Sequence, residues 1–483
     1  MGEITNKAVN GVKWTTVATV VVTLVQVLRL SVLTRLLEKS DFGLIAIASM
    51  VIGFTDIFSE LGLTVAIIHK QDITDKQYSS IYWTNILFSI IVFCITCGLS
   101  PFIANFYNEA ILSTIIPLLG IQILMNGFGK MFQTIKSKNL EYGFISKVRI
   151  VASGIGFVIT FIFALFDFGI YSLVIGQLSQ VAIMQGTYAF EGRRGQKILW
   201  HLNFSEISDF IRIGIYRLGS QVLDFFSSKI DVFLIGKFFG MDDLGIYNLA
   251  KELIQKPYSI VNQLTNSVAT SAFAKVQKDL AVVTSAFIKV ITIVGTIAIP
   301  IYVAIFISSD IIVEILYGSS YSEVALLLRI LSFVGIECAI SSQGAILQVS
   351  LGRTDLGFKW TIVRIICSIG IILLVSKINI TAVAYGQLFL SCALLYLFWL
   401  ISIKPLIFIS FSEYLKPFFR PFLASAIVAL PLYLFYNLLG LNVWWQVLEL
   451  VLFFSLFALY YFHYQREFVS QILGFILPKH RKI

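Results

Sequence analysis

The sequence predicts an all-α membrane protein that crosses the bilayer about fourteen times, and two observations support this. Hydrophobic residues make up 58% of the 483-residue chain and charged residues only 13%, with a mean hydropathy of +0.87. No water-soluble domain has that composition. Apolar runs of about 20 residues or more also recur along the chain, and each is long enough to cross a hydrocarbon core about 30 Å thick.

The apolar runs give the expected spans in order. The first follows a polar segment that ends at Lys13 and has no A-x-A cleavage site, which predicts an uncleaved helix and not a signal peptide. Short polar stretches separate the runs that follow. The expected spans are 14–36, 42–68, 81–106, 111–135, 147–167, 169–190, 211–237, 244–274, 282–308, 323–350, 356–376, 380–403, 420–440 and 442–463.

The positions of the cations predict the topology. The chain has 36 Lys and Arg residues, and most of those that lie outside the apolar runs are in the two tails and the even-numbered loops. Those in or beside the odd-numbered loops are Arg35, Lys39, Lys237 and Lys377. Because cytoplasmic loops carry the excess of Lys and Arg in membrane proteins, both termini are expected in the cytoplasm. An even number of spans follows.

An internal repeat indicates that the chain has two similar halves. RLLEKSDFG, from Arg35 to Gly43, aligns with KFFGMDDLG, from Lys237 to Gly245, at an offset of 202 residues (245 − 43). Further pairs at offsets of about 202 to 214 support the alignment: SKNLEYGF with LGRTDLGF, and YSLVIGQ with TAVAYGQ. We therefore expect two six-helix lobes, each built from one copy of the repeat.

The repeat divides the chain into four expected regions. They are an N-terminal lobe at 1–190, a cytoplasmic inter-lobe linker at 191–209, a C-terminal lobe at 210–403, and two further spans with a cytoplasmic tail at 404–483. Because six is even, the lobes have the same orientation and are related by a pseudo-two-fold axis along the membrane normal. Many secondary transporters consist of two such lobes that rock about a central site, with a hinge between them.

Polar residues recur at helical spacing on three expected spans of each lobe, which places each set on one helix face. In the C-terminal lobe the sets are Arg217, Gln221, Asp224, Ser228 and Asp231; Asn248, Glu252, Gln255, Ser259, Asn262 and Asn266, with Lys251 and Lys256 alongside; and Glu337, Ser341 and Gln348. In the N-terminal lobe they are Thr19, Thr23, Gln26 and Arg29; Ser49, Gly53, Asp56 and Glu60; and Gln122, Asn126, Lys130 and Gln133. We expect these polar stripes to converge on one hydrated cleft between the lobes.

The stripes suggest three roles for their residues. Cations suit an anionic substrate, because a diphosphate crosses hydrocarbon only where fixed charges replace its hydration. The candidate substrate-binding cations are Arg29, Lys130, Arg217, Lys251 and Lys256. Acids suit uptake of H⁺ or Na⁺, and the candidates are Asp56, Glu60, Asp224, Asp231 and Glu252. Uncharged residues expected in the cleft are Gln26, Asn126, Gln221, Asn248 and Asn262.

A structural role is the alternative for each of these residues. Hydrogen bonds between membrane helices are common, at about 0.6 kcal/mol each, and account for isolated Ser, Thr and Asn residues. They account less well for buried carboxylates, which are costly to keep without a partner. Pro257, inside the expected eighth span, is expected to kink that helix or to act as a packing bend.

No enzyme or metal motif is present. The sequence has no Gly-rich phosphate loop that opens a helix and no H-E-x-x-H. Cys94 and Cys97 form a C-x-x-C inside an apolar span, where packing is the expected role. We expect no catalytic residues, no metal, and no cofactor other than a coupling H⁺ or Na⁺. The positive charge follows the loops of a membrane protein, so no nucleic acid partner is expected.

Two segments carry a resemblance to a known family. RLSVLTRLLEKSDFGLIAIASMVIGFTDIFSELGLTVAIIHK, followed by SSIYWTN, resembles the opening of Wzx-type O-antigen and colanic-acid flippases, the polysaccharide transporters of the MOP superfamily. IGKFFGMDDLGIYNLAKELIQKPYSIVNQLTNSVATSAFAKVQ resembles the start of that family's second lobe. Lys39 and Ser271 stand where the family usually has proline.

The resemblance implies a function. A member of this family transfers undecaprenyl-pyrophosphate-linked oligosaccharide repeat units across the bacterial inner membrane by alternating access, with H⁺ or Na⁺ coupling. The lipid-linked oligosaccharide and membrane lipids are then the expected partners, with a polysaccharide polymerase and a chain-length regulator as candidates.

Two related transport functions remain as alternatives. A MATE-like exporter of small molecules would have a cavity dominated by acids, and usually twelve spans. A lipid II flippase is the other alternative, and only the resemblance to Wzx-type flippases distinguishes it from a flippase for oligosaccharide repeat units. A membrane enzyme such as a repeat-unit polymerase would carry a large periplasmic loop, which this sequence lacks.

Overall fold

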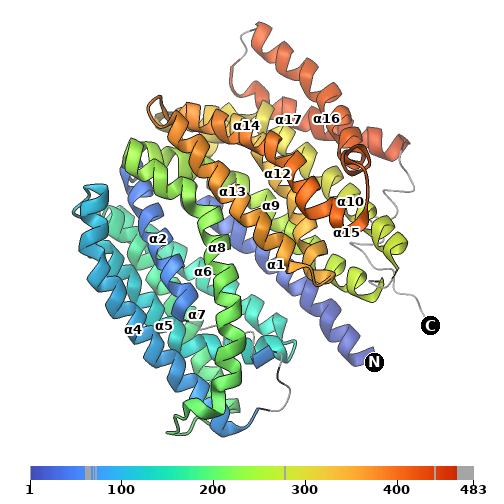
Figure 1. Cartoon of the computed structure of the whole chain (residues 1–483). Helices are drawn as coiled ribbons and strands as arrows, with labels where there is room; N and C mark the ends of the chain where they lie inside the picture. Colours follow the sequence, from blue (N-terminus) through green and yellow to red (C-terminus); the bar gives the residue numbers. More distant parts are fainter. Residues whose placement is uncertain are drawn as a thin grey trace. The chain divides into compact units, whose positions relative to one another are not determined.

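The computed structural model describes residues 2–59, 67–68, 70, 73–276, 279–439 and 442–464, with side chains left out at 2–9, 59, 209–217, 220, 264–276, 437 and 461–464. Every regular element in this part of the chain is helical (Figure 1), which confirms the predicted fold class. Contacts divide the chain into two compact units. Unit 1 is Met1–Leu249 with Thr361–Ile380, and unit 2 is Ala250–Trp360 with Thr381–Ile483.

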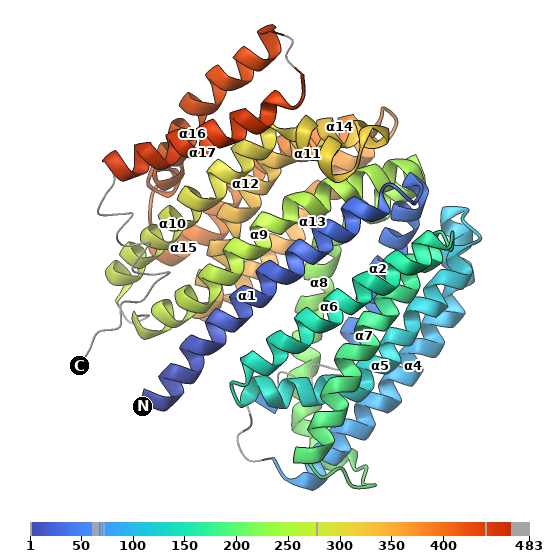
Figure 2. The same ribbon diagram turned by 180° about the vertical axis from the view of Figure 1, so that it is seen from behind.

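Unit 1 is a bundle of long helices. α1 packs against α6, α6 against α7, α7 against α5, and α5 against α4, while α2 contacts α5 and α8 (Figure 2). Its elements are α1 (Gly2–Leu33), α2 (Lys39–Ser59), α4 (Asp75–Tyr107), α5 (Leu112–Lys138), α6 (Tyr142–Leu165), α7 (Ile170–Gly195), the 3₁₀ turn η1 (Phe204–Ile207), α8 (Ser208–Phe239), the start of α9 (Met241–Val276) and most of α13 (Thr354–Val375).

An apolar core closes one end of unit 1. Tyr82 of α4, Phe132 of α5, Tyr188 of α7 and Ile207 of η1 are almost completely buried there. The predicted topology places these helix ends on the cytoplasmic side. The core therefore joins the predicted inter-lobe linker to the first bundle.

The repeated motifs meet at the start of α2 and of α9, inside unit 1. A Cβ at Gly43 would overlap the carbonyl oxygen of Met241, and a Cβ at Gly245 would overlap the carbonyl oxygen of Lys39. Met241 and Gly245 are the repeat equivalents of Lys39 and Gly43 (241 − 39 and 245 − 43 both give 202). The contact is therefore reciprocal. The two backbones can approach this closely only because Gly43 and Gly245 lack a side chain.

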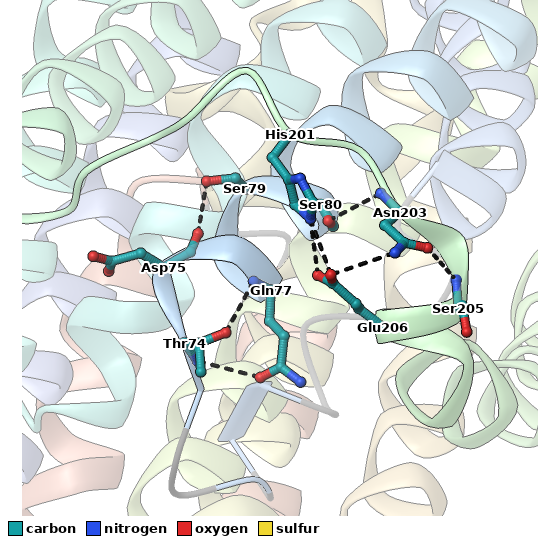
Figure 3. Close-up of polar contacts among 9 residues, drawn as sticks. All are labelled: Thr74, Asp75, Gln77, Ser79, Ser80, His201, Asn203, Ser205 and Glu206. Atoms are coloured by element: carbon teal, nitrogen blue, oxygen red, sulfur yellow. Dashed lines mark hydrogen bonds and ion pairs between the residues drawn. The ribbon is translucent and has the colours of Figure 1, made fainter.

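The linker at 191–209 lies against the first turns of α4. Its backbone N–H groups at Leu199 and Asn203 donate to Ser79 Oγ (2.9 Å) and Ser80 Oγ (3.1 Å). Trp83 donates through Nε1 to the Leu199 carbonyl (2.9 Å). Figure 3 shows the polar contacts around Ser80, Asn203 and Glu206. The expected inter-lobe linker is thus a strap that is hydrogen-bonded to one bundle at Leu199 and Asn203.

Unit 2 is built around α10, which packs against α12 and α16. α16 also contacts α17, and α11 contacts α12. The remaining elements are α10 (Leu280–Ile307), α11 (Ser309–Leu316), the 3₁₀ turn η2 (Ser319–Tyr321), α12 (Glu323–Ser350), α14 (Ile380–Phe398), the π-helical turn η3 (Trp399–Ile403), α15 (Lys404–Ile407), α16 (Phe411–Leu439) and α17 (Trp445–Tyr464).

Within the described residues, ten helices are long and apolar enough to cross a membrane. α7, α8 and α9 are 26, 32 and 36 residues long but are not among them. The polar side chains of α7, α8 and α9 lower the mean hydropathy of these three helices. In α17, the described apolar stretch, Trp445–Tyr460, is shorter than a membrane span requires. The multi-pass character is confirmed; the number of spans and the lobe boundaries stay predictions.

Candidate functional site

The predicted site residues fall in both units, and unit 1 holds the best-connected group. Asp56 of α2 accepts a hydrogen bond from Asn126 Nδ2 of α5 (3.0 Å) on one carboxylate oxygen. The other oxygen lies 3.4 Å from Lys130 Nζ, one turn further along α5. Both members of this ion pair are 27% exposed. The structure therefore brings together three predicted residues: a partly exposed pair of opposite charges and the amide that donates to its acid.

A second layer of this group comes from α7. Gln185 donates through Nε2 to Asn126 Oδ1 (2.8 Å), and Gln177 donates to Gln122 Oε1 (3.2 Å). A Cβ at position 129 would overlap Gln185, so Gly129 lets the two helices approach at this point. The bonds orient the Asn126 amide so that its NH₂ group faces Asp56.

Asp231 of α8 is buried and satisfied by hydrogen bonds. Its carboxylate accepts from the Tyr247 hydroxyl of α9 (2.9 Å) and from the backbone N–H of Val232 (2.9 Å). The side chain is 8% exposed. This geometry joins α8 to α9 and suits the structural alternative as well as ion coupling.

The rest of the α8 stripe is more open. Asp224 and Ser228 are exposed, and Gln221 is partly buried. Thr361 of α13 donates to Asp224 Oδ1 at 3.4 Å. α8 therefore presents an accessible carboxylate about two turns from the buried Asp231.

Unit 2 contains the charged part of the α9 stripe. Lys256 Nζ lies 3.9 Å from Glu252 Oε2, one turn away on the same helix, and Lys251 is partly buried beside them. Asn262 donates to the Tyr258 hydroxyl (3.2 Å). Burial, and to a lesser extent the nearby Glu252 charge, raise the pKa of the Tyr317 phenol, so that group stays protonated.

The other predicted residues are placed less closely. Gln26 and Arg29 lie three residues apart on α1, and Asn248 lies on α9 in unit 1; all three are partly buried. Glu60 and the side chain of Arg217 lie outside the described residues. Convergence of all six stripes on one cleft stays a prediction.

Sequence reasoning missed several partners in these groups. Gln177 and Gln185 are eight residues apart on α7, a helical spacing that places both on one face and is the signal that could have found them. Tyr247 lies one residue before the stripe that begins at Asn248 and gives no periodic signal.

The matching family supplies what the geometry alone does not. A family described as polysaccharide biosynthesis protein matches residues 32–326, more than half of the chain. The chain belongs to this family. The resemblance read from the repeated motifs is thereby confirmed.

Two relatives match the polysaccharide biosynthesis protein along most of its length. It is 27% identical over 440 residues to the teichuronic acid biosynthesis protein TuaB of Bacillus subtilis, with 88% of each chain covered. It is 24% identical over 420 residues to the lipopolysaccharide biosynthesis protein WzxC of Escherichia coli, covering 87% of this chain and 85% of that one.

Solved structures share its fold. A lipid II flippase MurJ in an inward closed conformation aligns with a TM-score of 0.75 at 16% identity, over 94% of this chain and 99% of that chain. The Vibrio cholerae MATE transporter VcmN aligns with a TM-score of 0.62 at 13% identity, over 86% and 99%. The likeness confirms the predicted all-α membrane fold.

Proposed function

We propose that this polysaccharide biosynthesis protein is a flippase for undecaprenyl-pyrophosphate-linked oligosaccharide repeat units. It moves them from the cytoplasmic to the periplasmic leaflet of the inner membrane, for synthesis of surface polysaccharide or lipopolysaccharide. The observation that carries the proposal is the similarity along most of the chain to TuaB and WzxC, both named for synthesis of such polymers. A fold shared with a lipid II flippase supports it.

The substrate chemistry fits the predicted cations. A pyrophosphate leaves water only where fixed charges and donors replace its hydration shell. Arginine suits this task because its planar fork binds phosphate through two hydrogen bonds. We assign Arg29 and Arg217 as pyrophosphate ligands, with Lys130, Lys251 and Lys256 as further cations.

The Asp56–Lys130 pair suggests how an ion gradient drives the cycle. A partly exposed ion pair contributes only about 0–1 kcal/mol, so its cation is easily diverted to another anion. When Asp56 binds H⁺ or Na⁺, its attraction for Lys130 weakens, and the cation can interact with the pyrophosphate instead. Asn126 keeps its contact with Asp56 in either state, which holds the carboxyl in place.

Unit 2 also holds an acid beside a cation, Glu252 and Lys256, here one turn apart on a single helix. We propose that this pair exchanges partners in the same way. Transport then needs no catalytic step, because the two lobes only have to open the site alternately to the cytoplasmic and the periplasmic side. The chain acts as a transporter and not as an enzyme, with both termini in the cytoplasm, and hands its substrate to a polymerase and a chain-length regulator.

An ion-coupled exporter of small molecules is the second candidate, because MATE transporters share the fold. Cations beside the acids favour the anionic lipid-linked substrate over a cationic drug. A lipid II flippase is distinguished only by the chemistry of the glycan. Both alternatives predict that surface polysaccharide synthesis does not depend on this chain.

Deletion of the gene in its host tests the proposal. We expect one complete repeat unit to accumulate on its polyprenyl pyrophosphate, measured by mass spectrometry, together with loss of the surface polymer and rescue by the wild-type gene. Normal lipid intermediates with an intact polymer, in a host with no second transporter of this class, would reject it. Accumulation of lipid II instead would favour a lipid II flippase.

A further inference from the structure

A polar cluster outside all the predicted stripes lies in unit 2, between α11, α12 and α17. Arg329 of α12 forms an ion pair with Asp310 of α11 (Nη2 to Oδ2, 2.6 Å). Its Nε also donates to Ser309 Oγ (3.1 Å). The two charges compensate each other, so Arg329 is already engaged by a carboxylate.

The last helix reaches into this cluster through Gln446. Its Nε2 donates to Asp310 Oδ2 (3.3 Å), and its Oε1 accepts from the backbone N–H of Ile311 (2.9 Å). The side chain is completely buried. These bonds fix the start of α17 against α11 and orient the next turn of the helix.

Glu449 lies on that next turn, three residues after Gln446 and on the same face. It is 6% exposed, and among the described residues neither carboxylate oxygen has a hydrogen-bond partner. A buried carboxylate without a donor or counter-ion costs several kcal/mol in the charged form. Nothing in the predicted stripes or in the proposed transport site accounts for such a residue.

The ionisable groups around Glu449 do not supply the missing charge. α16 contributes Tyr433 and Tyr436, and Tyr436 lies within electrostatic reach of Asp310, Arg329 and Glu449. α11 and α12 contribute the compensated Asp310–Arg329 pair. On α10, which also contacts α17, the Tyr302 hydroxyl is engaged elsewhere, because it donates to the Ile254 carbonyl (3.0 Å).

We propose that Glu449, held beside the Asp310–Arg329–Gln446 cluster, is an exchangeable proton-binding site. A proton neutralises the carboxylate with no further ligand, whereas Na⁺ would need several more oxygens around it. Glu449 lies five residues after Trp444, which is exposed at the start of the helix. The predicted topology places this helix end on the periplasmic side, so the proton is taken from there.

Infrared spectroscopy of the purified full-length protein in lipid nanodiscs tests the proposal without any transport assay. Its result is thus independent of the proposed function. We expect the C=O stretching band of a protonated carboxylic acid, which disappears reversibly as the pH is raised and is absent from the Glu449→Gln variant. Glu314→Gln, on α11 one turn from Asp310, is the matched control and should retain the band.

A second variant keeps the test decisive if the Gln variant is not recovered. Asp310→Asn leaves Arg329 without its carboxylate, so the cation should attract Glu449 and weaken its proton binding by about tenfold or more. The band should then disappear at least about one pH unit lower. Three results would overturn the proposal: no band at any pH, a band that Glu449→Gln retains, or a band that never titrates.

Discussion

Gly43 and Gly245 occupy equivalent positions in the two copies of the repeat, and each lies against a backbone carbonyl of the other copy's motif. Gly43 faces Met241, and Gly245 faces Lys39. The predicted topology puts this crossing at the periplasmic ends of α2 and α9. A duplication that is visible in the sequence thus becomes a symmetric contact between the duplicated segments.

Alanine at either glycine should destabilise the protein. A Cβ at these sites would overlap backbone, which cannot move aside as a flexible side chain can. The loss of stability should therefore exceed the roughly 1–3 kcal/mol that overpacking usually costs. Thermal unfolding of the purified Gly43→Ala and Gly245→Ala variants measures it. Gly154→Ala, on α6 with open space around the added methyl, is the control; equal stability of all three variants would contradict the close crossing.

Lys130→Ala should reduce polymer export by about tenfold or more, because a charge-assisted contact with phosphate contributes roughly 1.5–3 kcal/mol. Asp56→Asn should keep the Asn126 contact but make transport insensitive to the ion gradient. Flux into proteoliposomes with and without an imposed gradient distinguishes the two effects.

Lys136→Ala is the matched control for Lys130. Lys136 lies on the same helix and is also paired with an acid, Glu141 (2.7 Å), but it is outside the predicted stripe. Its loss should leave export unchanged. A similar loss of export in both Lys variants would remove the reason for placing the substrate at Lys130.

Arg29→Ala and Arg217→Ala should each abolish export while the protein still reaches the membrane. The reason is the bidentate phosphate contact that only Arg provides, so the Lys variants should recover part of the activity. Surface polysaccharide and membrane-localised protein are measured together. Arg353→Ala, which removes an exposed pair with Asp355, serves as the control; unchanged export in both test variants would sink this site assignment.

The fold class could be predicted because hydrophobicity and periodicity act locally. Helix ends could be predicted less well. α4 begins at Asp75, not at 81, because its first turn is polar and is held by a capping box between Thr74 and Gln77. α11 was not expected at all, since a helix of eight residues is too short to stand out between two spans.

The candidate site was predictable to the extent that it follows single-helix periodicity. Spacing put Asp56 on one stripe, and Asn126 and Lys130 on another, and the structure brings them together. Spacing does not give the rotation of a neighbouring helix, so the Tyr247 partner of Asp231 could not be found. The same limit hides Glu449, whose environment depends on the helices packed around α17.

The strap between α7 and α8 should loosen when its acceptors are removed. In the Ser79→Ala/Ser80→Ala double variant, the amides of Leu199 and Asn203 lose these two hydrogen bonds, each worth about 0.5–1.5 kcal/mol. Hydrogen exchange at 196–207 should become at least about tenfold faster. Ser100→Ala, at the far end of α4, should have no such effect, and unchanged exchange in the double variant would contradict the docked strap.

Translocation by the reconstituted protein tests the central claim most directly. The lipid-linked repeat unit that accumulates in the deletion strain would be placed in both leaflets of liposomes with and without the protein. Its glycan would then be exposed to a membrane-impermeant modifying enzyme outside. We predict that the protein makes the inner-leaflet pool accessible, faster with an ion gradient and not at all with Arg29→Ala. Protection of that pool, at the level of protein-free liposomes, would contradict the flippase assignment.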